Sequence, residues 1–137
     1  MALNISTKMR DVIAGAVDIF NSGSLEIRSG AAPGPNAADS GTLLADITLP
    51  ADAFGAVASG VISKAGTWED TSADGTGTAA HWRMKQSGDT GGATGATDER
   101  LEGTAGTSGT DMILDNDSIA TGQTVTVTAF SITSPAS

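Results

Sequence analysis

The chain of 137 residues contains no cysteine and no tyrosine, and it has a single histidine, His81. The absence of cysteine excludes disulfides, thiolate zinc sites and cysteine nucleophiles. A single histidine excludes any metal site that needs more than one histidine ligand. Only 7 basic side chains stand against 16 acidic ones, which gives a formal net charge of −9. Nucleic acid is therefore disfavoured as a partner, because phosphate contacts need clustered lysine and arginine.

The sequence also lacks a long apolar run. Lys8, Arg10, Asp11 and Asp18 interrupt the apolar residues of the first twenty positions. A secretory signal needs an uninterrupted apolar stretch, and a membrane span needs about 20 apolar residues. We therefore expect a soluble protein without a targeting segment and without a membrane partner, folded as one domain over residues 1–137.

The strongest local pattern is helical. Apolar residues recur at the spacing of one helix face: Met9, Val12, Ile13, Ala16, Val17 and Phe20. Ser6 or Thr7 can cap the start, and Gly23 can take the left-handed conformation that ends a helix. The pattern predicts a helix over residues 7–21, preceded by an extended arm over 1–6. The apolar stripe either covers an open face of a sheet, which is the commoner case, or binds a membrane or a partner.

After Gly23 the apolar period changes from 3.6 to 2, which is typical of strands. The predicted strands are 25–28, 43–49, 56–64, 67–70, 80–85, 101–105, 112–114 and 124–133. The stretches 29–41, 71–78 and 87–98 lack apolar periodicity and are predicted to be loops or turns. Within 124–133 the apolar phase flips after Val127, which a β-bulge or a strand passing between two sheets would produce.

These elements predict a mainly β fold, in which one N-terminal amphipathic helix accompanies a β-sandwich of seven or eight short strands over residues 24–133. A jelly-roll-like topology is preferred, although the sequence does not determine the strand order. Aromatic residues make up only 4% of the chain. The modest hydrophobicity of each strand indicates that a partner supplies some of the stabilising burial.

No pattern for catalysis is present. His81 lies between Ala80 and Trp82 in a predicted strand, where alternation places it on the polar face as a solvated histidine. The chain has neither the G-x-S-x-G turn of serine hydrolases nor a phosphate-binding G-x-x-x-x-G-K-[ST] loop. We therefore expect no catalytic residues, no cofactor and no enzymatic activity.

Acidic residues cluster at Asp111, Asp115 and Asp117 around Asn116. Such oxygen-rich loops bind calcium in EF-hands, but the glycine at the sixth position and the closing glutamate are missing here. A polar turn with side-chain caps is the favoured interpretation, and no metal site is predicted. Calcium near Asp115 and Asp117 stays open as an alternative.

Four residues are predicted to contact another subunit: Leu3, Ile5, Met9 and Trp68. Leu3 and Ile5 alternate with polar or small residues, as in an extended arm that docks on another chain. Trp68 stands beside Glu69 and Asp70, a combination found in sugar-binding sites. In a chain so poor in aromatics, however, tryptophans are more often core anchors, so the alternatives for Trp68 stay open.

A set of short segments, taken in their order and spacing, resembles a family of small virion proteins of tailed bacteriophages that are encoded among the head genes. The segments are Leu25-Glu26-Ile27, Pro33, Leu43-Leu44-Ala45, Leu49-Pro50, Ala53-Phe54-Gly55, Gly60-Val61, Gly77-Thr78-Ala79, Trp82-Arg83, Gly106-Thr107-Ser108-Gly109, Ile119 with Gly122, and Val125, Val127, Phe130 and Ile132. The chain departs from that pattern by a longer Gly/Thr-rich segment at 87–98.

The resemblance implies a head decoration, or cement, protein that binds the outside of a phage capsid and bridges major capsid protein subunits. It implies synthesis in the host cytoplasm and localisation on the virion. The thin core separately predicts self-association, as a homodimer or a homotrimer. The alternative is a tail or fibre component that binds a host surface glycan. Counting copies in the virion separates the two, since a capsid protein is present in hundreds of copies.

Overall fold

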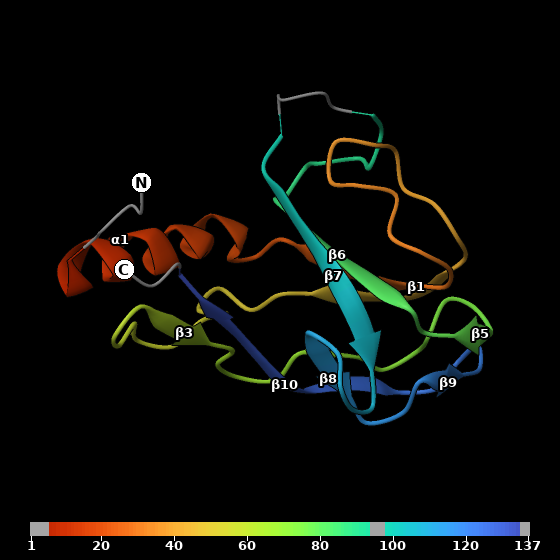
Figure 1. The fold of residues 1–137 in the computed structure, drawn as a ribbon. Helices are drawn as coiled ribbons and strands as arrows, with labels where there is room; N and C mark the ends of the chain where they lie inside the picture. The colour runs from red at the N-terminus through yellow and green to blue at the C-terminus, as the bar shows by residue number, and fades with distance from the viewer. Residues whose placement is uncertain (1–5, 94–97, 135–137) are drawn as a thin grey trace.

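The computed structural model describes residues 6–93 and 98–134, except for the side chain of Arg10. The fold is mainly β, with one N-terminal helical segment beside a curled sheet that forms a half-barrel (Figure 1). The predicted fold class is therefore confirmed, while the sandwich and the jelly-roll topology are not. Residues 1–5, which hold most of the predicted arm, lie outside the described residues.

The helical segment consists of α1 (Thr7–Gly15) followed by a 3₁₀-helix, η1 (Ala16–Phe20). The Ser6 hydroxyl accepts a hydrogen bond from the Met9 backbone N–H at 3.2 Å, as predicted for the N-cap. The predicted end is wrong in one respect, because Ser22, not Gly23, takes the positive φ of 60°. Gly23 is needed for a different reason: a Cβ there would collide with the Lys85 carbonyl oxygen of the neighbouring strand.

The first half of the sheet runs in the order β2-β1-β6-β7 and is antiparallel throughout. Its strands are β1 (Ser24–Arg28), β2 (Leu43–Thr48), β6 (His81–Lys85) and β7 (Arg100–Gly106). Leu25, Ile47, Met84 and Leu101 share one row of paired residues and lie on the face toward the core. The alternating polar residues of these strands form the opposite face.

The second half of the sheet is built around β10 (Val125–Thr133), the longest strand. β10 pairs successively with β4 (Glu69–Asp70), β8 (Met112–Leu114) and β3 (Val61–Ser63). Its register shifts between Val127 and Ala129, which agrees with the β-bulge, one of the two predicted alternatives. The bulge turns both Val127 and Phe130 into the core, so one strand can serve two parts of a curled sheet.

Two further strands, β5 (Gly77–Thr78) and β9 (Ser118–Ile119), form a small separate pair. The predicted strand 56–64 is shorter than expected. Ser59 and Gly60 both adopt positive φ and turn the chain, so only β3 remains extended. An aromatic chain of contacts runs through the core from Phe54 to Trp68, then to Phe130 and Trp82, with ring centroids 5.1–5.7 Å apart.

Candidate interaction surface

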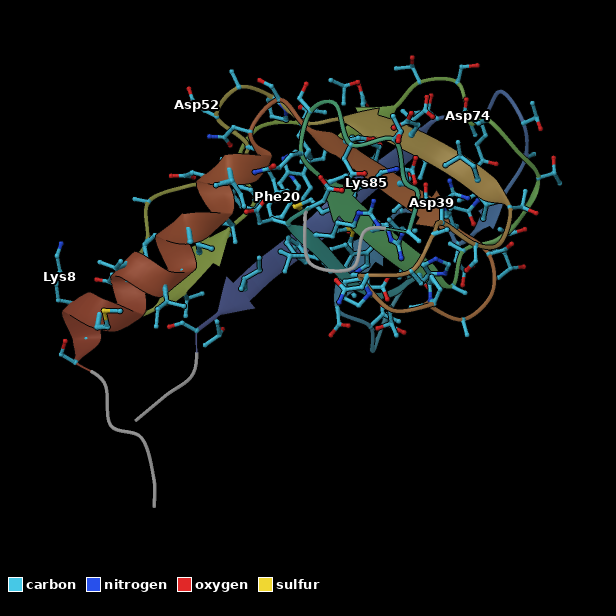
Figure 2. The ribbon with its side chains drawn as sticks, turned by 90° about the horizontal axis from the view of Figure 1, so that it is seen from above. Lys8, Phe20, Asp39, Asp52, Asp74 and Lys85 are labelled. Carbon is cyan, nitrogen blue, oxygen red and sulfur yellow. The ribbon has the colours of Figure 1, made fainter. Side chains whose placement is uncertain are left out.

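The helical segment of α1 and η1 leaves several large apolar side chains exposed. Met9, Val12, Ile13 and Ile19 each leave 39–57% of their surface accessible, while Ala14, Val17 and Phe20 are buried. Figure 2 shows why: Phe20 lies where the helical segment meets the sheet, whereas Lys8 lies at the end that extends away from it. Of the two interpretations of the stripe, covering a sheet face applies only to its C-terminal part. We call the four exposed residues the helix patch.

The helix is held in this position by a few specific contacts. The Asp11 carboxylate accepts a hydrogen bond from the Gly60 backbone N–H at 2.7 Å, at the turn that precedes β3. Gly15 lies close to Val57, since a Cβ there would be 3.7 Å from the valine methyl. These contacts orient α1 so that the helix patch faces solvent.

Next to the helix patch lies an apolar groove with a volume of about 510 Å³. Its walls come from the helical segment on one side and from β7 and β10 on the other. The apolar lining residues are Ile13, Ala16, Val17, Ile19, Phe20, Leu101 and Ile132. Asp98, Glu99 and Arg100 also line the groove and make part of it charged.

A second hollow of about 270 Å³ continues the groove along the sheet, because Leu101 and Ile132 line both. Trp82, Phe130 and Asp111 complete its lining together with Glu102 and Ser131. The indole N–H of Trp82 is buried and has no hydrogen-bond partner among the described residues. The two hollows therefore form one continuous, mainly apolar groove that reaches the aromatic core.

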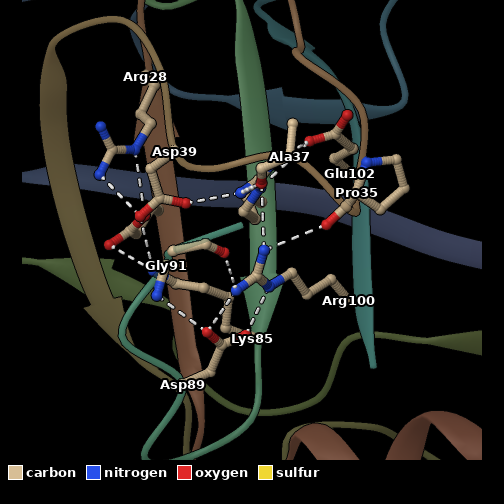
Figure 3. Close-up of polar contacts among 12 residues, drawn as sticks. Arg28, Pro35, Ala37, Asp39, Lys85, Asp89, Gly91, Arg100 and Glu102 are labelled. Atoms are coloured by element: carbon tan, nitrogen blue, oxygen red, sulfur yellow. Dashed lines mark hydrogen bonds and ion pairs between the residues drawn. The ribbon is translucent and has the colours of Figure 1, made fainter. Parts of the chain in front are cut away.

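The polar face of β1, β6 and β7 is covered by a cluster of four cations and four carboxylates (Figure 3). The cations are Arg28, Arg83, Lys85 and Arg100, and the carboxylates are Glu26, Asp39, Asp89 and Glu102. Asp39 comes from the loop after β1, and Asp89 comes from the loop after β6. The cluster fastens both loops over the sheet, so this face is closed to solvent.

Arg83 is the centre of the cluster and is fully buried. Its guanidinium donates to Glu102 Oε2 at 2.9 and 3.2 Å and to Asp39 Oδ1 at 2.8 Å. It also donates to the carbonyl oxygens of Gly34 and Ala37, both at 2.8 Å. The three bonds to Gly34, Ala37 and Asp39 fix the loop that follows β1 to the middle of the sheet, and the two bonds to Glu102 link β6 to β7.

Arg100 organises the second loop in the same way. Its guanidinium donates to both oxygens of Asp89, at 2.6 and 2.7 Å, and to the Gly92 carbonyl at 2.8 Å. The hydrogen bonds from Arg100 lower the pKa of Asp89, and the same pair raises the pKa of Arg100. The prediction that 87–98 is a loop is confirmed for its described residues, but the loop is anchored there rather than free.

The pKa of Asp39 reflects two opposing effects. Burial alone would raise it, but the hydrogen bond from Lys85 at 3.0 Å and the charges of Lys85, Arg28 and Arg83 outweigh burial. The pKa of Asp39 therefore lies below its usual value of 3.8. Gly91 packs so closely against this carboxylate that a Cβ would collide with it, and the Gly91 carbonyl accepts the Asp39 backbone N–H at 2.8 Å.

The expectation of a solvated His81 is wrong. Its phase on β6 is as predicted, on the polar face, but that face is covered and His81 is buried. Its Nδ1 is 2.7 Å from the Gly30 carbonyl oxygen, while Nε2 has no partner among the described residues. The histidine therefore holds the start of the loop that covers β1 and β6.

The acidic residues near Asn116 act mainly as caps. Asn116 accepts the Ser118 N–H at 3.0 Å, and Asp115 accepts the Thr126 N–H at 3.1 Å. Asp111 lies apart from both and accepts the Thr104 N–H and hydroxyl at 3.0 and 3.2 Å. Within the described residues no group of three or more acidic or histidine side chains is placed to hold a metal ion.

Of the four predicted interface residues, only Met9 lies on an exposed surface. Leu3 and Ile5 are outside the described residues. Trp68 is 0% exposed, packs against Phe54 and Phe130, and donates its indole N–H to the Ala65 carbonyl at 3.1 Å. The core-anchor interpretation of Trp68 is confirmed, and its side chain offers no surface to a partner or a sugar.

Sequence reasoning missed Leu101 and Ile132 as partly exposed residues, because each lies in an apolar strand pattern that predicts burial. It also missed Ile19, which lies off the predicted helical stripe. It also missed the charged cluster, although a signal was present: charged residues sit at alternate positions on three strands, at 26 and 28, 83 and 85, and 100 and 102. Four of the seven basic residues of the chain are used there.

Within the described part of the chain, no helix has the length and apolar character needed to cross a membrane. Comparison with protein-family models, with curated proteins and with solved structures found no match.

Proposed function

We propose that this protein is a structural virion protein that decorates the outer surface of a phage capsid and cements neighbouring major capsid protein subunits. The observation that carries the proposal is the helix patch, which presents Met9, Val12, Ile13 and Ile19 to solvent. Contiguous exposed apolar residues on a soluble protein mark sites of protein contact. The sequence resemblance to phage head proteins supplies the identity of the partner.

The distribution of charge supports binding through the helix. The charged cluster contains equal numbers of cations and carboxylates, so the net charge of −9 arises from the residues outside it. Outside the cluster the only basic residues are Lys8, Arg10 and Lys64, and two of these belong to α1. The helix is thus the element that an acidic protein surface would repel least.

Cementing needs many weak contacts rather than one strong contact. A single helix patch is small, but identical patches repeated over a symmetric shell add up through multivalency. The anchored loops and the closed polar face keep the β body rigid, so that one copy can transmit force between two capsid subunits. The acidic net charge also disfavours adhesion to packaged or host nucleic acid.

The test is binding to expanded heads purified from a phage that lacks this gene. Added protein should sediment with the heads and saturate at hundreds of copies per particle. Val12→Asp should lower the bound fraction at least tenfold, since it places a charge in the helix patch. Ser108→Asp, on the exposed loop between β7 and β8, is the matched control and should bind as the natural protein does.

Absence of binding to heads would overturn the proposal. Binding to tails instead, at a few to dozens of copies, would favour the tail or fibre alternative. Equal binding by the Val12→Asp and Ser108→Asp proteins would show that the helix patch is not the contact surface.

A further inference from the structure

Among the described residues, the sheet leaves a strand position vacant between β7 and β10. β7 pairs with β6 through Arg100–Thr104, but on its other side it pairs with β8 only through Ala105 and Gly106. β10 likewise pairs with β8 only as far as Phe130, although it continues to Thr133 along β3. Beyond the start of β8, Arg100–Thr104 of β7 and Ser131–Thr133 of β10 therefore face each other with no described strand between them. We call this space the strand gap.

The strand gap coincides with the apolar groove. Arg100, Leu101, Glu102, Ser131 and Ile132, which border the gap, all line one or both of the hollows described above. Leu101 and Ile132 point toward the core but are only partly buried, because no described residue covers them there. The gap thus leaves both backbone edges and core side chains open at one place, where β7 and β10 separate toward the helix (Figure 1).

The side chain of Asp111 lies at the boundary between β8 and the strand gap. Asp111 directly precedes β8, and its carboxylate accepts the Thr104 N–H at 3.0 Å. This bond takes the place of the backbone carbonyl that a longer β8 would supply. The positions alongside Arg100–Gly103 have no such substitute among the described residues, so they remain available to an added strand.

We propose that residues 2–5 of a second copy of this chain occupy the strand gap as an added strand, which extends the line of β8. Four residues in extended conformation span about 13 Å, which matches the four positions along Arg100–Gly103. Leu3 and Ile5 alternate with Ala2 and Asn4, so both apolar side chains enter the groove on the same face. There they contact Val17, Phe20, Leu101 and Ile132 and complete the open end of the core.

The same segment of the same chain cannot place both apolar side chains beside Val17 and Phe20. Ile5 immediately precedes Ser6, which caps α1, so its Cα lies about 3.8 Å from that of Ser6. Val17 and Phe20, which line the groove, lie 11 and 14 residues further along the helical segment, more than about 15 Å away. A second copy is therefore the source of the strand. The proposal concerns self-association alone and does not depend on the capsid role.

Disulfide trapping tests the proposal directly, because the natural chain has no cysteine. Ser131 is exposed and alternates with the inward-facing Phe130 and Ile132, so it shares the outer face with Asn4 of the inserted strand. Asn4→Cys protein mixed with Ser131→Cys protein should give a mixed disulfide on mild oxidation. Ser108→Cys, equally exposed but remote from the gap, is the control partner. Equal trapping at positions 108 and 131 would overturn the proposal.

Self-association supplies the second test. By sedimentation velocity the full chain should form an oligomer whose fraction rises with concentration. Deleting residues 2–5, or the double change Leu3→Asp and Ile5→Asp, should give a monomer with an unchanged circular dichroism spectrum, whereas Asn4→Ser should not. A full chain that stays monomeric at all concentrations, or a deletion that associates normally, would refute the inserted strand. No capsid is present, so failure here leaves the head-binding test intact.

Discussion

At the scale of single residues, the molecule depends on buried charges that are completely paired. Arg83 makes five hydrogen bonds with no exposed surface, and the planar guanidinium is what allows it to reach two carboxylates and two carbonyls at once. Lysine could not reproduce this geometry, since it has one point charge on a flexible stem. A buried ion pair is not in itself strongly stabilising, but removing one member leaves the other charge unpaired.

We therefore predict that Arg83→Met lowers the free energy of unfolding by about 3–5 kcal/mol. The change leaves Glu102 without its arginine partner and frees the loop carbonyls of Gly34 and Ala37. Denaturant unfolding followed by tryptophan fluorescence measures the loss. Lys8→Met, on the exposed start of α1, removes a charge without a buried partner and should change stability by less than about 0.5 kcal/mol. Similar values for the two variants would contradict the proposed role of Arg83.

At the scale of elements, the helical segment divides into an exposed part and a buried part. Val12 is 57% exposed on α1, whereas Val17 is 8% exposed on η1. The same residue type therefore occurs in both environments, only five positions apart. This pair separates an interaction surface from a packing surface within one segment.

Val17→Ala should destabilise the protein by about 1–2 kcal/mol, because it removes two buried methyl groups and leaves a small cavity. Val12→Ala should change stability by no more than about 0.5 kcal/mol, since the removed groups already contact water. Thermal unfolding of both variants at one low protein concentration gives the comparison. Equal losses would mean that Val12 is covered in solution and that the helix patch is not free.

Some of the secondary-structure elements could be predicted from the sequence, and others could not. The strand at 112–114 and the bulge in β10 were predictable, because apolar alternation and its phase shift are local signals. β5 and β9 were not, since two residues carry no period. Val12 and Val17 fall on the same predicted stripe, and only the non-local packing of the helix against β3 and the sheet decides which one is buried.

At the scale of the whole molecule, strand order was beyond prediction, because it depends on which distant segments pair. β1 and β6 are neighbours although about fifty residues separate them in the chain. The candidate site depended on the same non-local facts: the strand gap exists because β8 is short and β10 is long. The apolar residues that border the strand gap were predicted to lie in strands. Their partial exposure to solvent was not predicted.

The protein as a whole should lose stability in acid. The folded pKa values of Asp39 and Asp89 lie below 3.8, so each contributes stability that is present above 3.8 and is lost as the pH falls through its folded value. Asp74 acts in the opposite sense, because burial and the neighbouring charge of Asp70 raise its pKa. The first two dominate, since protonating them breaks ion pairs with buried cations.

Melting temperatures measured from pH 7 down to pH 3 should therefore stay nearly level at first and fall steeply below about pH 4. Asp89→Asn should lower the melting temperature at pH 7, since the carboxylate that pairs with Arg100 is gone. The decrease in melting temperature between pH 7 and pH 3 should then be smaller than in the natural protein. Asp74→Asn should raise the melting temperature at pH 7 and have little effect at pH 3. A melting temperature independent of pH over this range would contradict the role assigned to the charged cluster.

The positions of the two tryptophans make their intrinsic fluorescence a probe of the groove. The chain has no tyrosine, so its near-ultraviolet emission comes from Trp68 and Trp82 alone. Trp68 is buried in the core, whereas Trp82 lines the groove and its indole N–H has no hydrogen-bond partner among the described residues. In a Trp68→Phe protein the emission would report on Trp82 alone, and a strand entering the groove would shift its wavelength without any attached label.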